Sequence, residues 1–228
     1  MNFAQLHNWE VTPAEAVELQ RELAGQVVLR DCLAERPVLV AGADVSYRWH
    51  GEQFYAAVSV LSLPGLQPVA EATARGRVTF PYVPGLLSFR ELPILLKAFQ
   101  QLSVLPDLVL VDGQGIAHPR RLGLASHLGL WLDLPTIGCA KSRLCGEHGP
   151  VGKCRGQQVP LYVGQEQVGV VLTTRDRVRP LYLSQGHKIG LRRAVEQVLI
   201  CGGGYRLPEP VRQAHLLSNR LRREVEGG

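Results

Sequence analysis

The segment from Leu108 to Arg121 places residue types that bind metal and phosphate close together along the chain. Its first four residues are apolar and form a run short enough to be a strand that is buried on both faces. The run ends on the carboxylate of Asp112, and Gly113 and Gly115 then let the backbone turn sharply and approach a ligand closely. An acidic residue at a strand end, followed by such a turn, can hold a cation beside a bound ligand.

Three side chains that suit phosphate follow this turn, namely His118, Arg120 and Arg121. Imidazole titrates near neutral pH, and guanidinium groups bind phosphate oxygens in pairs. The combination predicts a metal-assisted phosphodiester site. From this segment alone, a turn in which Asp112 only caps backbone amides and His118 is an ordinary surface-loop residue is an equally open interpretation.

Two further carboxylates, Asp44 and Glu91, are candidates to share a cation with Asp112. Asp44 lies between Ala43 and Val45, where a charge is costly unless it is paired, hydrogen-bonded or bound to metal, or unless it faces outward from a half-exposed strand. Glu91 closes the sequence S-F-R-E, which fits a capping box, and the spacing alone favours that role. Magnesium usually takes one or two carboxylates with phosphate oxygens and waters, so these three acids would be sufficient.

Three other side chains suit a site that cleaves nucleic acid. Lys141 follows an expected strand and could neutralise charge on a phosphate, although exposed lysines without such a role are commoner. His215, in an expected helix, could donate an N–H group. Tyr82 lies between two prolines that stiffen the backbone, so its ring could stack on a base or fill the gap left by one. A ring folded back onto the core is the alternative.

The composition agrees with a nucleic-acid partner. The chain has 228 residues, is 46% hydrophobic and carries a formal net charge of +5, and its cations are mostly arginine, which binds phosphate and stacks on bases. This length predicts one domain with one substantial core. Neither a membrane span nor a signal peptide is evident, and five cysteines favour free thiols over disulfides or a zinc site, so a soluble cytoplasmic protein is expected.

The first third of the chain is expected to form one helix and three strands. The sequence T-P-A-E at 12–15 fits a capping box with proline at the first helical position, which opens a helix towards Arg30. Alternating and apolar runs then predict strands at 38–47, 55–63 and 67–78. The turns between these strands are short, and this implies antiparallel pairing.

The remainder is expected to alternate between helices and strands. Apolar residues recur at helical spacing from Leu92 to Leu102, and residues 144–167 are glycine-rich and expected to be irregular. The alternation predicts that the sheet becomes parallel and is covered by helices. Further strands are expected at 108–111, 135–139, 168–174 and 181–184, and further helices at 122–132, 190–200 and 209–224.

Five stretches of the chain together resemble the endonuclease V family, the deoxyinosine 3′-endonucleases. They occur in the family's order and span most of the sequence. The matching stretches are G-A-D-V-S-Y at 42–47, P-Y-V-P-G-L-L-S-F-R-E at 81–91, V-D-G-Q-G-I-A-H-P-R-R-L-G-L-A-S-H at 111–127, P-T-I-G-C-A-K-S-R-L-C-G at 135–146 and G-Y-R-L-P-E-P-V-R-Q-A-H at 204–215.

The resemblance implies a ribonuclease H-like α/β fold, a mixed sheet with an antiparallel N-terminal part flanked by helices, in a single domain over residues 1–228. It also implies a DNA repair endonuclease that depends on magnesium, with manganese as a substitute, and that acts as a monomer on DNA containing deoxyinosine. Such an enzyme hydrolyses the second phosphodiester bond 3′ to the lesion and leaves 3′-hydroxyl and 5′-phosphate ends. Alternatives are an inosine-specific endoribonuclease, a structure-directed nuclease on the same fold and a non-catalytic nucleic-acid-binding protein.

Residue roles follow from the same resemblance. Asp44, Asp112 and Glu91 match the metal ligands, which replaces the preference for a cap at Glu91, and Lys141 and His215 match supporting catalytic positions. Some family members carry aspartate at the position of His215. The resemblance assigns contacts with the damaged DNA to the wedge Tyr82 and to the base pocket of Gly85, Leu87, Gly113 and Leu124, beside the phosphate-binding candidates His118 and Arg120.

Overall fold

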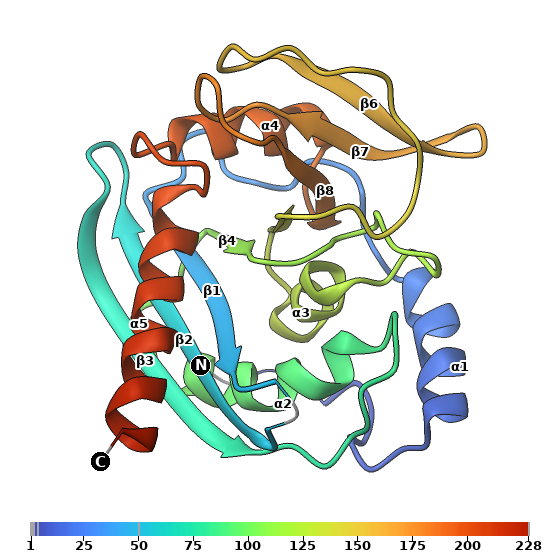
Figure 1. The fold of residues 1–228 in the computed structure, drawn as a ribbon, viewed down its shortest axis with the longest axis vertical. Helices are drawn as coiled ribbons and strands as arrows, with labels where there is room; N and C mark the ends of the chain where they lie inside the picture. The colour runs from blue at the N-terminus through green and yellow to red at the C-terminus, as the bar shows by residue number, and fades with distance from the viewer. Residues whose placement is uncertain (1–2, 4, 50, 228) are drawn as a thin grey trace.

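One sheet forms the centre of the structure, a computed structural model that describes residues 3, 5–49 and 51–227. The strands lie side by side in the order β3-β2-β1-β4-β5-β8-β7-β6 (Figure 1), with bounds β1 (Leu39–Tyr47), β2 (Gln53–Ser62), β3 (Gln67–Arg77), β4 (Leu108–Val111), β5 (Thr136–Ala140), β6 (Gln158–Val163), β7 (Glu166–Leu172) and β8 (Leu181–His187). Helices flank the sheet, namely α1 (Pro13–Ala24), α2 (Leu87–Gln100), α3 (Leu124–Leu132), α4 (Leu191–Ile200) and α5 (Glu209–Glu226).

The middle of the sheet is parallel and its two sides are antiparallel. Strand β4 pairs in parallel with β1 on one side and with β5 on the other. Strands β2 and β3 continue from β1 in antiparallel register, and β8, β7 and β6 do the same from β5. The predicted mixed sheet with an antiparallel N-terminal part is therefore confirmed.

Helices cover both faces of this sheet. On one face α2 and α3 pack against alternate residues of the central strands, such as Ala43 and Val111. On the other face α4 and α5 pack against the residues that alternate with these along the same strands, such as Val40 and Leu110. Figure 1 shows α5 lying along β1 and β2. Gly42 allows this close contact, because a Cβ there would lie 1.9 Å from the carbonyl oxygen of Pro210, just inside α5.

The N-terminal helix begins where the sequence predicts and ends earlier. Thr12 Oγ1 accepts a hydrogen bond from the Glu15 amide at 3.3 Å, and the Thr12 amide donates to the Glu15 carboxylate at 2.7 Å, which completes the capping box. The helix stops at Ala24 and does not continue towards Arg30. Glycine at position 25 and the β-branched residues that follow favour a helix less than the preceding sequence does.

Two predictions about local structure are wrong. The segment 144–167 is irregular only as far as Gln157, because β6 follows and forms a hairpin with β7 through a turn at Gly164, where φ is +61°. Pro160 weakens the strand pattern in the sequence, but β6 is an edge strand, where a missing donor is tolerated. Glu91 is not a capping residue, because α2 already begins at Leu87 and its first turn has no side-chain cap.

None of the helices in the described part of the chain is long and apolar enough to cross a membrane.

Candidate active site

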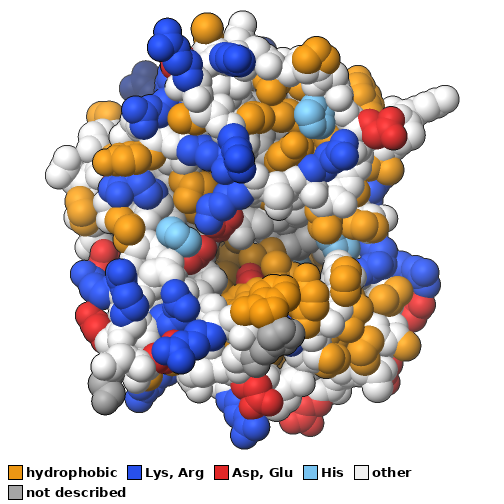
Figure 2. All heavy atoms as spheres, in the orientation of Figure 1, with side chains coloured by type: hydrophobic (Ala, Val, Ile, Leu, Met, Phe, Trp, Pro, Cys, Tyr) orange, Lys and Arg blue, Asp and Glu red, His pale blue; other side chains and the backbone are white. Residues whose placement is uncertain are grey.

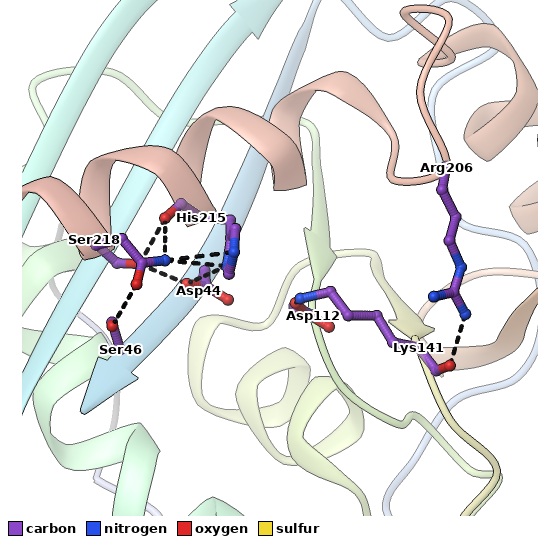
Figure 3. Close-up of polar contacts among 8 residues, drawn as sticks. Asp44, Ser46, Asp112, Lys141, Arg206, His215 and Ser218 are labelled. Atoms are coloured by element: carbon purple, nitrogen blue, oxygen red, sulfur yellow. Dashed lines mark hydrogen bonds and ion pairs between the residues drawn. The ribbon is translucent and has the colours of Figure 1, made fainter. Parts of the chain in front are cut away.

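Three charged residues meet where the parallel strands end. Strands β1 and β4 pair Ala43 with Val111, so Asp44 and Asp112 occupy the next positions on neighbouring strands. The Asp112 amide donates to the carbonyl of Ala43 at 3.2 Å. Lys141 directly follows β5, the next parallel strand, and forms an ion pair with Asp112 (Figure 3). The carboxyl ends of adjacent parallel strands lie at one edge, and this brings the three side chains together.

Helix α5 supplies the partners of Asp44. Ser218 donates its hydroxyl to Asp44 Oδ2 at 2.5 Å, and His215 Nδ1 lies 3.3 Å from the same oxygen (Figure 3). The hydrogen bond with Asp44 raises the pKa of His215 above its ordinary value. Asp44 is buried, so the outward-facing alternative is wrong, and its charge is stabilised by hydrogen bonds from the helix that covers β1.

Asp112 sits between an attractive and a repulsive neighbour. Burial and the negative charge of Asp44 raise its pKa, while the ammonium group of Lys141 acts in the opposite direction. Lys141 is itself positioned through its main chain, because Arg206 donates to its carbonyl oxygen at 2.6 Å (Figure 3). The sequence predicts that Lys141 neutralises phosphate charge. In the protein without nucleic acid it neutralises the charge of Asp112.

Glu91 is buried beside these carboxylates, and among the residues that the structure describes only the charge of Arg90 acts against the resulting rise in its pKa. Its side chain forms no hydrogen bond or ion pair with another described residue, and 6% of it is exposed. Burial raises its pKa well above the ordinary value, and the charges of Asp44 and Asp112 raise it further. A buried carboxylate beside two others favours a cation, since positive charge would offset both the desolvation and the repulsion.

The donor set fits a divalent cation. Asp44, Asp112 and His215 each offer a ligand atom, and these atoms lie within 4.8 Å of one another. The predicted third ligand, Glu91, lies outside this set but lines the same cavity of about 340 Å³ with the other three residues and Lys141. Carboxylate oxygens suit magnesium, and an imidazole nitrogen also suits softer ions such as manganese. The geometry therefore supports metal binding without selecting one metal.

A second, less polar cavity of about 440 Å³ adjoins the first and shares Tyr47, Asp112 and Lys141 with it. Figure 2 shows this face hollowed near its centre, with acidic side chains in the hollow, hydrophobic ones along its rim and Lys and Arg side chains gathered beyond. The structure brings the residues predicted from the family's base pocket together in this cavity. The predicted pocket residues line it, and so do the wedge candidate Tyr82 and the phosphate-binding candidate His118. The pocket residues are Gly85, Leu87, Gly113 and Leu124.

Two aromatic rings stand at the rim of this cavity. Tyr82 is 57% exposed, so the alternative of a ring folded onto the core is wrong. Trp49, which follows β1, lies with its ring centroid 5.9 Å from that of Tyr82 and is also largely exposed. Exposed aromatic rings at a cavity rim offer flat surfaces on which bases can stack.

The side chains predicted to bind phosphate face inward. His118 is buried, so the surface-loop interpretation is wrong: one ring nitrogen accepts from the Arg120 amide at 3.1 Å and the other donates to the Gly85 carbonyl at 2.9 Å. Arg120 also donates to Gly85, and Arg121 forms an ion pair with Glu166 at the β6–β7 hairpin. In this structure these cations hold parts of the protein together.

Several residues of the two cavities carry no signal that sequence motifs alone would single out. Asn219 and Arg222 line the carboxylate cavity, and Ser218 beside it binds Asp44. All three follow His215 on one face of α5, and the helical spacing i+3, i+4 and i+7 could have identified them. Gln20 lies on the apolar face of α1, where a buried polar residue is itself a signal.

Comparisons with known proteins give one consistent result. A family model described as endonuclease V matches residues 21–216. The endonuclease V of Dehalococcoides mccartyi (strain BAV1) is 53% identical over 220 residues, which cover 95% of this chain and 97% of that protein. The crystal structure of endonuclease V from Streptomyces avermitilis is similar with a TM-score of 0.89 at 43% identity, covering 96% of each chain.

A structure with bound nucleic acid is also similar. It is that of Ciona intestinalis endonuclease V in complex with a 24mer DNA containing an inosine followed by a ribo-adenosine. The TM-score is 0.80 at 26% identity, and the match covers 93% of this chain and 98% of that one.

Magnesium or manganese should stabilise the folded protein, and Asp112→Asn should remove most of this effect. The cation relieves the repulsion among the buried carboxylates, and at about 100 times its Kd it would add about 2.7 kcal/mol to the free energy of unfolding. Thermal unfolding with and without cation measures this for both proteins. Glu18→Gln, on the exposed side of α1, is the control and should respond as the wild type does. Equal stabilisation of the Asp112 variant would contradict the proposed ligand set.

Acid should destabilise the protein through His118. Burial lowers the pKa of His118 to about 4 in the folded state, whereas the unfolded chain has a value near 6.5. Its contribution is fully present above pH 6.5 and is lost as the pH falls to about 4, by on the order of 3 kcal/mol. Urea unfolding of the wild type and His118→Asn at pH 7, 5 and 4 should show their difference in stability shrinking. A constant difference in stability would show that His118 has the same pKa in the folded protein as in the unfolded chain.

Proposed function

The chain belongs to the endonuclease V family of nucleases, and we propose that it repairs DNA by cutting beside deoxyinosine. The bond cut is the second phosphodiester on the 3′ side, and the products carry 3′-hydroxyl and 5′-phosphate ends. One observation carries the proposal: Asp112 and Lys141 line both the cavity beside Tyr82 and the cavity of the carboxylates. A nucleotide extruded into the first cavity would leave the phosphates that follow it beside the second.

Recognition rests on main chain and shape. Tyr82 would fill the gap in the duplex, while Gly85, Leu87, Gly113 and Leu124 would surround the extruded base. Hypoxanthine presents O6 and N1–H where adenine has an exocyclic amine and a bare nitrogen, so its edge offers a different pattern of donors and acceptors. Lost pairing with the opposite base also makes its extrusion less costly. The inosine-containing DNA bound by the Ciona enzyme supports this choice of lesion.

For the chemical step we propose Asp44 and Asp112 as ligands of magnesium, with manganese as a substitute and Glu91 as the third acid. The bound cation supplies the charge that polarises phosphoryl oxygens and lowers the pKa of water. His215 holds Asp44 in place, and the cation favours the charged form of Glu91. Lys141 can turn from Asp112 towards the phosphate, because its ammonium group is partly exposed.

His118 and Arg120 then act on the DNA indirectly. Their donors are directed at the carbonyl of Gly85, inside the protein, so we propose that they hold the wall of the base cavity and do not bind phosphate themselves.

Inosine in RNA is the second candidate substrate. It is favoured by one observation, that the oligonucleotide in the Ciona complex carries a ribo-adenosine after the inosine. We further propose that the chain works as a monomer of one domain in the cytoplasm. The five cysteines are free thiols, which suit a reducing compartment such as the cytoplasm.

Incubation with labelled oligonucleotides should give one magnesium-dependent cut, at the second bond 3′ to deoxyinosine. Parallel substrates with uracil, with no lesion and with inosine in RNA test the lesion and the sugar. Asp112→Ala should lose more than about a thousandfold in rate, because the cation is worth several kcal/mol in the transition state, while inosine DNA still binds. Full incision by purified Asp112→Ala, or cutting of every substrate alike, would overturn the proposed function.

Tyr82→Ala should weaken binding of inosine DNA without weakening binding of the metal. Stacking on a base contributes roughly 1–3 kcal/mol, so affinity should fall about tenfold or more while binding of undamaged DNA changes less. Fluorescence anisotropy with both duplexes measures the difference, and Tyr162→Ala, an exposed tyrosine on β6, is the matched control. Unchanged discrimination by the Tyr82 variant would remove the wedge from the proposal.

A further inference from the structure

Three side chains converge on a single backbone oxygen behind the base cavity. The carbonyl oxygen of Gly85 accepts hydrogen bonds from Gln20 Nε2 at 3.0 Å, His118 Nε2 at 2.9 Å and Arg120 Nη2 at 2.9 Å. A carbonyl oxygen has two lone pairs, so three donors saturate it. The peptide group of Gly85 is therefore held in one orientation more firmly than a loop peptide ordinarily is.

Gln20 connects the partners of this oxygen to one another. It lies on α1 with 1% of its surface exposed, between the apolar residues Ala16 and Leu23 of the same buried face. Its amide nitrogen also donates to the carbonyl of Leu122 at 3.1 Å, and its amide oxygen accepts from Arg120 Nε at 2.5 Å. One buried amide thus bonds the loop before α2, the segment before α3 and Arg120.

The hydrogen bonds of His118 select one tautomer of its neutral ring. Its Nδ1 accepts the hydrogen bond of the Arg120 amide, so the proton of the neutral ring is on Nε2, the atom that faces Gly85. In this tautomer His118 donates to the Gly85 carbonyl together with Gln20 and Arg120.

The loop that they hold contains the recognition residues. Gly85 has φ of +81°, which residues with a Cβ rarely adopt, and a Cβ there would lie 2.8 Å from Arg120 Nη2. The Leu86 amide donates to the carbonyl of Val83 at 2.9 Å and closes a turn directly after Tyr82. Orientation of the Gly85 peptide therefore decides where Tyr82 stands and which main-chain groups face the cavity.

We propose that Gln20 is a positioning residue for base recognition. It fixes residues 81–87, the recognition loop, so that the loop's main chain meets the extruded base in one conformation. Backbone readout of a purine edge needs such rigidity, because a mobile loop can adjust its donors and acceptors to the wrong base. The choice of substrate rests on the proposed function. The claim that Gln20 holds the recognition loop concerns the free protein and does not depend on that function.

Gln20→Met and Gln20→Glu test it, with Gln197→Met as the matched control. Methionine keeps the length of glutamine and removes all three of its hydrogen bonds. Glutamate keeps the acceptor for Arg120 and loses the donor to Gly85 and Leu122. Gln197 is equally buried, at 1% exposed, but lies on α4, on the other face of the sheet and outside both cavities. A general cost of removing a buried amide therefore appears in the control as well.

Hydrogen exchange of the free protein is the first readout. Exchange of the peptide covering residues 82–87 should rise about tenfold in both Gln20 variants, the factor expected for one lost hydrogen bond of ordinary strength. It should stay at the wild-type rate in Gln197→Met. Unchanged exchange in this peptide, or a rise of the same size throughout the protein, would overturn the proposal.

Steady-state cleavage is the second readout. The ratio of kcat/KM for deoxyinosine over deoxyadenosine should fall about tenfold in the Gln20 variants, mainly through KM, with kcat at saturating substrate nearly unchanged. Loss of kcat with an unchanged ratio would show a purely structural role and overturn the proposal. If the wild type did not cut inosine DNA, the proposed function would fail, while the exchange measurement would still decide the role of Gln20 in the loop.

Discussion

Electrostatic repulsion among buried carboxylates is the constraint on which the rest of the site depends. Asp44, Glu91 and Asp112 come from a strand, a helix and a strand end, and each is desolvated by the elements that hold the others. Lys141, His215 and Ser218 offset two of the three charges. Within the described part of the chain, the charge of Glu91 is opposed only by that of Arg90, and a bound cation would relieve the repulsion that remains.

The sheet topology makes this arrangement possible. Parallel pairing of β1, β4 and β5 brings residues from three distant parts of the sequence to one edge, and α5 then lies across β1 because Gly42 leaves room for its first turn. Helix α2 reaches the same edge from the opposite face and contributes Glu91. The base cavity forms beside it, lined by the loop between β3 and α2 and by the residues that follow β4.

Much of this fold follows from local sequence, and the differences have identifiable causes. The limits of β4 are those of its apolar run, and α1 begins at its capping box, because short-range pattern and capping decide both. The capping interpretation of Glu91 failed because α2 starts one residue before Ser88, and only tertiary packing shows that Glu91 faces two aspartates. Arg120 and His118 are residue types that bind phosphate. Their actual partner, the Gly85 carbonyl, is distant in the sequence, so the adjacent residues do not predict it. The long motifs of the family identified the residues that line the cavities, whereas Gln20 belongs to none of these motifs.

The adjacency of Asp112 and Gly113 has a consequence for where the strand is cut. One residue belongs to the cation site and the next to the wall of the base cavity, and they are joined by a single peptide bond at the end of a buried strand. If the proposed function is correct, the covalent geometry at the end of β4 sets the distance from the lesion to the bond that is cut. Mutations in the surrounding loops could alter which bases are accepted, but they would not shift the incision by one nucleotide.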